Sequence, residues 1–126
     1  MIQQQTVLKV IDNSGAKTAK CIKVLGGFKK QFAKVGDFII VSIQKLRNRA
    51  KETSRVSKGE IFKGIIVQTK RKKTKKDGSN FYMLENSIVL INKQGNPVAT
   101  RILGPIPRLL KKKNIIKFAS LSPGFY

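Results

Sequence analysis

Two clusters of lysine and arginine are the residues of this chain whose type and spacing could do chemistry. Six of the seven residues in Lys70–Lys76 are basic, and a second basic segment occupies Arg47–Lys51. Long cationic side chains at this density can neutralise several phosphates at once, and counterion release then supplies affinity independent of base sequence. Lysines suit a phosphate backbone better than a base-reading groove. The clusters therefore predict loops that contact a polyanion.

The whole chain carries the same sign as these clusters. Its 126 residues include 27 Lys and Arg, 6 Asp and Glu and no His, a formal net charge of +21. A small domain kept cationic only for solubility would usually carry a net charge of roughly 2–8. A much larger excess draws in phosphate-rich partners. We therefore predict a nucleic-acid-binding protein.

Catalytic chemistry has few candidate residues here. General acid–base catalysis usually needs His or a paired carboxylate, and the chain has no His. Cys21 lies among apolar residues with no histidine to activate it, so we expect a buried structural side chain. No Cys/His set for zinc, phosphate-binding loop or dinucleotide fingerprint occurs. We predict no enzyme, no cofactor and no metal site. Turn positions account for most of the carboxylates, namely Asp12, Asp37, Glu60 and Asp77.

Short β-rich runs separated by glycine turns fill most of the chain and predict an all-β barrel or sandwich in one domain, residues 1–126. Within one run, Ile39, Val41 and Ile43 share a face, as in a half-buried strand. Pro107 predicts a short helix through Lys113. The expected strands are Val7–Ile11, Ala19–Leu25, Phe38–Leu46, Ile61–Thr69, Phe81–Leu84, Ser87–Asn92 and Val98–Leu103.

Composition also bounds the compartment and the kind of partner. We expect no signal peptide, transit peptide or membrane segment, and a single cysteine fits a reducing compartment. Few aromatic residues argue against a base-stacking sheet, which favours a folded RNA read by its shape. Two rivals remain, an architectural duplex-DNA-binding protein and a cationic protein at anionic membranes. The second lacks the long amphipathic basic helix it would need.

Ordered sequence blocks then resemble a known family. The chain opens with Thr6-x-Leu8-x-Val10-x-Asp12-Asn13-Ser14-Gly15-Ala16-Lys17 and continues with Cys21-Ile22-Lys23-Val24-Leu25-Gly26-Gly27. Further blocks are Gly36-Asp37, Lys58-Gly59, Gly64-Ile65-Ile66-Val67, Asp77-Gly78, Asn86-x-x-Val89-Leu90, Gly95-Asn96-Pro97, Thr100-Arg101-Ile102 and Gly104-Pro105. Together they resemble the universal large-subunit ribosomal protein L-fourteen family over essentially the whole chain. Two departures are Met83, where the family usually has an aromatic residue, and a longer loop at Arg47–Ser57.

The resemblance implies a mainly β fold, with a small five-stranded β-barrel, a projecting β-ribbon and a short helical C-terminal segment. It implies a structural constituent of the large ribosomal subunit that binds large-subunit rRNA on the intersubunit face. Its implied partners are small-subunit rRNA at an intersubunit bridge, the neighbouring ribosomal proteins L-three and L-nineteen, and a ribosome-silencing factor that blocks subunit joining.

The resemblance and the charge pattern also imply site residues. The expected factor-facing patch is Thr100, Arg101 and Lys117. The expected RNA-binding residues are Asn13, Ser14, Lys17, Lys23, Lys29, Lys30, Arg47, Arg49, Lys51, Lys70, Arg71, Lys72, Lys73, Lys75, Lys76 and Arg108.

The coding genome is expected to be AT-rich, because 21 of the 27 basic residues are lysine and 15 residues are isoleucine. Codons for both amino acids are rich in A and T. We therefore favour an organelle-encoded protein of the mitochondrial matrix over one of the bacterial cytoplasm.

Overall fold

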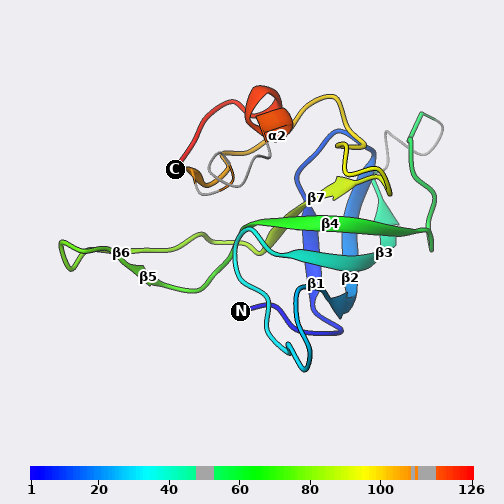
Figure 1. Ribbon diagram of the computed structural model, residues 1–126. Coiled ribbons are helices and arrows are strands. Elements are labelled where there is room, and N and C mark those ends of the chain that lie inside the picture. Colours follow the sequence, from blue (N-terminus) through cyan, green and yellow to red (C-terminus); the bar gives the residue numbers. More distant parts are fainter. Residues whose placement is uncertain (48–52, 109, 111–115) are drawn as a thin grey trace.

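A closed five-stranded β-barrel forms the body of the molecule, and a two-stranded ribbon projects from it (Figure 1). The computed structural model describes residues 1–47, 53–108, 110 and 116–126. The predicted all-β fold, with its barrel, ribbon and short C-terminal helix, is confirmed. The barrel strands are β1 (Val7–Val10), β2 (Ala16–Val24), β3 (Phe38–Leu46), β4 (Ile61–Gln68) and β7 (Ser87–Ile91). The ribbon strands are β5 (Lys73–Thr74) and β6 (Asn80–Phe81), and the helix is α2 (Ile116–Leu121).

The barrel closes through an unusual pair of strands. Neighbours in the order β1-β2-β3-β4-β7 are antiparallel, but β1 and β7 run parallel, with Lys9 opposite Ser87 and Val10 opposite Ile88. The registers give the barrel two distinct ends. The loop between β2 and β3 and the ribbon both leave one end, here called the ribbon end. The chain between β3 and β4 and the chain after β7 leave the other, the far end.

Alternating side chains fill the barrel interior. Ile39, Val41 and Ile43 of β3 are buried as the period-2 pattern predicts. Cys21 on the neighbouring strand is 1% exposed, which confirms its expected structural role. Burial raises the pKa of this thiol because desolvation disfavours the thiolate. Cys21 is therefore a small core side chain that is held protonated.

Residues 64–67 of β4 and all of β7 are buried on both faces. Ile66 and Ile88 point into the barrel, whereas Ile65, Val67 and Val89 pack outward against the C-terminal chain. A strand covered on both faces has no need for a polar face, and all five residues of β7 are buried accordingly. The covering apolar residues include Ile102, Ile106, Leu110 and Phe118. The C-terminal segment thus forms a second core on the outside of the barrel, beside α2 (Figure 1).

Two predicted elements need correction. The expected strand Val98–Leu103 is wrong, because the segment makes one isolated bridge, between Ile102 and Asp12, and Pro97 just before it makes another with Ile91. The amide N–H groups of Thr100 and Arg101 donate to the side-chain oxygen of Asn13 instead of to a strand. Of the expected strand Phe81–Leu84, only Phe81 is paired. Most of the helix expected after Pro107 lies outside the described residues.

The C-terminal tyrosine joins the second core to the ribbon. The Tyr126 hydroxyl donates to the Val67 carbonyl of β4, and the ring centroid lies 5.1 Å from that of Phe81. Its backbone N–H donates to Ile106, and its carbonyl oxygen accepts from Arg108. Burial raises the pKa of Tyr126 from 10.0 to about 12. The neutral phenol is therefore favoured by folding.

Substituting Tyr126→Phe should flatten the alkaline pH dependence of stability. The folded pKa lies above the unfolded one, so this contribution is complete below pH 10.0 and is lost as the pH rises to about 12. Urea unfolding of both proteins across this range measures the effect. The phenylalanine variant should start less stable by roughly 1 kcal/mol, the usual net value of a hydrogen bond, and decline less steeply. If the unfolding free energies of the two proteins change with pH in parallel, the raised pKa of Tyr126 is contradicted.

Candidate nucleic-acid interface

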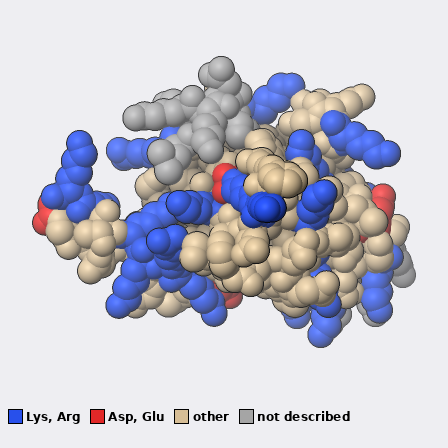
Figure 2. Space-filling view, turned by 60° about the horizontal axis from the view of Figure 1, so that its bottom comes forward, with Lys and Arg blue, Asp and Glu red and all other residues tan. Residues whose placement is uncertain are grey.

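Cationic side chains from two segments far apart in sequence meet at the ribbon end, beside the N-terminal segment. The N-terminal Met1, Lys34 from the β2–β3 loop, and Arg71, Lys72 and Lys73 from the ribbon line one surface cleft of about 420 Å³. Figure 2 shows the dense gathering of lysine and arginine on this face. Burial lowers the pKa of Lys73, since desolvation disfavours its charged form. We name this site the ribbon-end cleft.

The ribbon is fixed where it leaves the barrel. The backbone N–H of Lys70 donates to the Asn86 side chain over 2.9 Å, and that of Met83 donates to the Thr69 carbonyl over 3.3 Å. At the tip, Asp77 accepts hydrogen bonds from the backbone N–H and hydroxyl of Ser79, which lower the pKa of the carboxyl. The predicted basic loop is therefore part of a hairpin whose arms carry Lys72 and Lys73 and whose tip carries Lys75 and Lys76.

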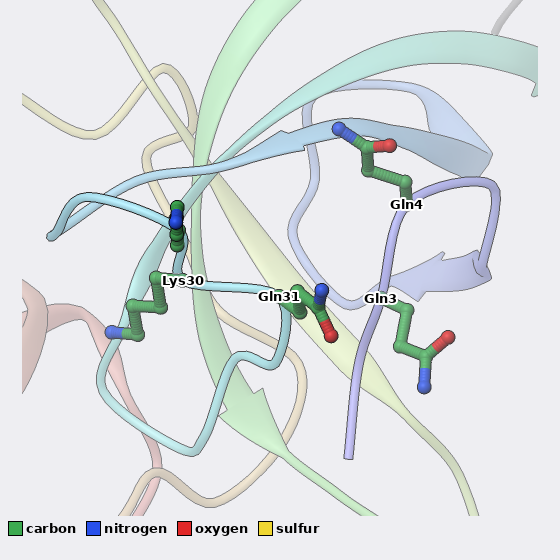
Figure 3. Close-up of a pocket in the computed structure, with 5 residues that line it drawn as sticks. Gln3, Gln4, Lys30 and Gln31 are labelled. Atoms are coloured by element: carbon green, nitrogen blue, oxygen red, sulfur yellow. The ribbon is translucent and has the colours of Figure 1, made fainter.

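A second surface cleft, of about 590 Å³, lies at the same end of the barrel. It is lined by Gln3 and Gln4 of the N-terminal segment and by Lys29, Lys30 and Gln31 of the β2–β3 loop (Figure 3). The two segments are joined by backbone hydrogen bonds between Ile2 and Ala33. Lys30 also forms an ion pair with Asp37 over 3.0 Å. Two clefts with cationic walls therefore share the ribbon end.

The other expected RNA-binding residues differ in how exposed their side chains are. Lys17, Lys23 and Arg108 are exposed. Arg47 is half-buried, and its guanidinium donates to the Val10 carbonyl over 3.1 Å. Ser14 is 1% exposed and its hydroxyl donates to Asp12, so this residue has no surface to offer RNA. Arg49 and Lys51 lie outside the described residues.

Asn13 serves a structural role beside the expected factor-facing patch. Its side-chain oxygen accepts from the backbone N–H groups of Thr100 and Arg101, and its amide nitrogen donates to the Thr100 hydroxyl over 2.9 Å. Thr100 and Arg101 are exposed. Lys117 is also exposed and donates to Asn96 over 2.6 Å. Because Ile102 N–H donates to the Leu121 carbonyl, α2 lies beside the segment that carries Thr100 and Arg101.

The described carboxylates all have structural partners. Asp12 and Asp77 hold serine turns, and Asp37 and Glu60 accept from backbone N–H groups. Glu85 pairs with Lys9 over 2.6 Å, and Asp37 also pairs with Lys30. These carboxylates are committed to turns and ion pairs, and with 6 Asp and Glu against 27 Lys and Arg they offset only a small part of the cationic charge.

Sequence reasoning missed some residues of these clefts. Lys34 and the N-terminal segment belong to them because the Ile2–Ala33 bridge brings the chain start to the β2–β3 loop. The clustering of Lys29, Lys30 and Lys34 in one loop was the available signal for Lys34. No comparable pattern marks Gln3 and Gln4.

The described residues meet the requirements of neither a metal site nor a membrane-spanning helix. Among them, no group of three or more His, Cys, Asp or Glu side chains could hold a metal ion. In the same part of the chain, no helix has both the length and the apolar character needed to cross a membrane.

The barrel, its ribbon and the gathered cations define a small cationic β-barrel protein with a surface suited to a polyanion. The sequence matches the family described as Ribosomal protein L14p/L23e over residues 1–126, and the chain belongs to that family. It is therefore a structural protein of the large ribosomal subunit, from a family that is in general not enzymatic. Membership also implies contact with ribosomal RNA and with other ribosomal proteins.

Removing the charge of Asp12 should destabilise the barrel. One carboxylate oxygen accepts from the Leu90 N–H over 2.9 Å and the other accepts from Ser14, so Asp12→Asn turns an NH₂ group toward a buried donor. An unsatisfied buried group costs about 1–3 kcal/mol, which chemical denaturation would measure.

The matched control is Asp77→Asn, because Asp77 makes the same pair of bonds to a serine in an exposed turn. Its unfolding midpoint should hardly move. Equal loss of stability in the two variants would show that burial of Asp12 is not the cause.

Proposed function

We propose that this protein docks onto large-subunit rRNA through the ribbon end of its barrel. The observation that carries the proposal is the ribbon-end cleft, where Met1, Lys34, Arg71, Lys72 and Lys73 surround one cavity. A phosphate placed there would meet several cations supplied by different segments. Counterion release would supply affinity, and the fixed positions of the cations would supply a preference for one RNA shape. The protein makes no covalent change to the RNA and acts as a structural component.

The proposed contact set follows from exposure. It keeps exposed Lys17, Lys23, Lys29 and Arg108, half-buried Lys30 at the second cleft, and the ribbon residues, and it omits Ser14 because that side chain is buried. Asn13 and Arg47 act by positioning, through Arg101 and Val10 respectively. Arg49 and Lys51 remain proposed contacts from the charge pattern alone.

We further propose that the far end of the barrel faces the small subunit and contributes to an intersubunit bridge. A protein that contacts two rRNAs needs two separated surfaces, and the far end carries exposed Lys58 and Lys93 and half-buried Arg47. Ribosomal proteins L-three and L-nineteen are the proposed protein neighbours, on the family resemblance alone.

Thr100, Arg101 and Lys117 form the proposed docking patch for a ribosome-silencing factor. Support comes from their exposure and from the anchoring of the 100–101 segment by Asn13.

Arg101→Glu should abolish capture of the silencing factor of the same organism in a pull-down with purified proteins, since it replaces a cation with an anion. Lys45→Glu, an equal charge change on exposed β3, should leave capture intact. Equal capture by both variants would contradict the patch.

We also propose that residues 1–126 act as one folded unit, because the C-terminal segment completes the core over β4 and β7.

The lysine and isoleucine bias supports synthesis in the mitochondrial matrix in preference to a bacterial cytoplasm. Immunodetection in ribosomes of purified mitochondria tests that location, and absence from them would refute it.

The rRNA proposal is tested by binding across a salt series. The wild-type protein should remain on large-subunit rRNA at salt concentrations that remove it from unrelated folded RNA and from duplex DNA. Equal or better binding to duplex DNA would favour the architectural DNA-binding alternative. If binding to all three nucleic acids falls equally as salt rises, shape-specific docking is contradicted.

A variant with Arg71, Lys72 and Lys73 all replaced by Gln should have a shallower salt dependence. Each lost phosphate contact reduces the slope of log K against log salt by roughly 0.7–0.9. The matched control replaces exposed Lys45, Lys58 and Lys93 by Gln, which removes the same charge away from the ribbon end. If both triple variants change the slope equally, the ribbon-end cleft has no special role.

A further inference from the structure

A nearly bare aromatic ring contacts Lys29, one of the residues that line the second cleft at the ribbon end. Phe28 in the β2–β3 loop is 93% exposed. The ammonium of its neighbour Lys29 lies 5.5 Å from the ring centroid, a cation–π distance. An exposed ring flanked by cations is suited to stack on a nucleobase, whose phosphate the neighbouring lysines can bind.

The cleft next to this ring is lined by polar and cationic side chains whose aliphatic stems form part of its wall. Gln3, Gln4 and Gln31 supply side-chain amides, and Lys29 and Lys30 supply ammonium groups. Within the described residues, no protein group hydrogen-bonds to these three side-chain amides. Each amide offers both donors and an acceptor, the groups needed to bind a base edge or a ribose hydroxyl. Two ammonium groups beside three amides match the phosphate and base edge of a nucleotide, so the functional groups of the lining favour RNA over a hydrophobic protein segment.

The loop that carries Phe28 is held at its base. The Asp37 carboxylate accepts from the Lys34 backbone N–H over 2.8 Å and pairs with Lys30, while Ala33 exchanges backbone hydrogen bonds with Ile2. Gly26 and Lys29 both adopt positive φ, of 103° and 56°, which shapes the turn around Phe28. Figure 3 shows the N-terminal segment and this loop side by side, carrying Gln3 and Gln31. The ring is therefore presented from a fixed platform.

We propose that Phe28 stacks on one unpaired nucleobase of the bound RNA, with the adjacent cleft holding that nucleotide. Lys29 and Lys30 contact its phosphates, and the glutamine amides hydrogen-bond to its base edge or ribose. This inference rests on the proposed rRNA-binding function. It adds a subsite for a single-stranded nucleotide to a surface otherwise built for phosphates.

The test compares affinity and chemical probing of base edges for complexes with large-subunit rRNA. Wild-type protein should protect an unpaired base that becomes reactive in the Phe28→Ala complex, and affinity should fall roughly 5- to 150-fold, the range for loss of one stacked base. Phe28→Trp should restore both. The control Ile61→Ala removes an apolar side chain that is 62% exposed at the far end, and it should change neither readout.

The outcomes separate the two proposals. Unchanged affinity and protection in Phe28→Ala would overturn the stacking subsite, while the salt behaviour of the ribbon variants would still stand. The subsite is equally overturned if Phe28→Trp fails to restore the protection lost in Phe28→Ala. Failure of the wild-type protein to prefer large-subunit rRNA would instead overturn the docking function itself. Thermal melts of the Phe28 variants should match the parent, because this ring packs against so little of the protein.

Discussion

The buried carboxylate of Asp12 is the contact on which barrel closure and the adjacent surface both depend. Only two residue pairs register β1 against β7, so the bond from Leu90 N–H to Asp12 adds substantially to a short parallel seam. The other oxygen of Asp12 fixes Ser14 and thus the turn that starts β2. Asn13 lies between Asp12 and Ser14 in this turn, and its side chain positions Thr100 and Arg101. One turn therefore links the closure of the barrel to the conformation of an exposed segment distant in sequence.

Sequence periodicity predicts the barrel where burial is local and regular. Strand β3 has the expected bounds, and β1, β4 and β7 differ from expectation by one residue at one end, because alternating or continuous apolar runs identify them. The segment 98–103 fails because its amide groups bond to Asn13, nearly ninety residues earlier, which no local pattern reveals. The burial of Ser14 is missed for a related reason, since a small polar turn residue looks the same in sequence whether it faces solvent or a buried carboxylate.

Charge density likewise predicts only part of the binding surface. The run Lys70–Lys76 is visible from composition, but its folding into a hairpin depends on Asp77 and Ser79 at the tip and on Phe81 packing near Tyr126. The ribbon-end cleft also needs Lys34 and the chain start, which meet the ribbon only through tertiary contacts. Phe28 is missed because a single exposed aromatic residue in a loop has no periodic signature.

Like charges gathered in a cleft repel one another, and 6 Asp and Glu offset little of the charge of 27 Lys and Arg. The ribbon end must therefore be held together by uncharged contacts, such as the two-sided burial of β4 and β7 and the backbone bridge between Ile2 and Ala33. Neutralising the cations by phosphates removes the repulsion in the bound state, and a ligand that binds only the folded protein stabilises it by mass action. The surface that opposes folding of the isolated chain is thus the same surface through which an RNA partner would stabilise it. This coupling favours a protein that reaches its greatest stability only after assembly.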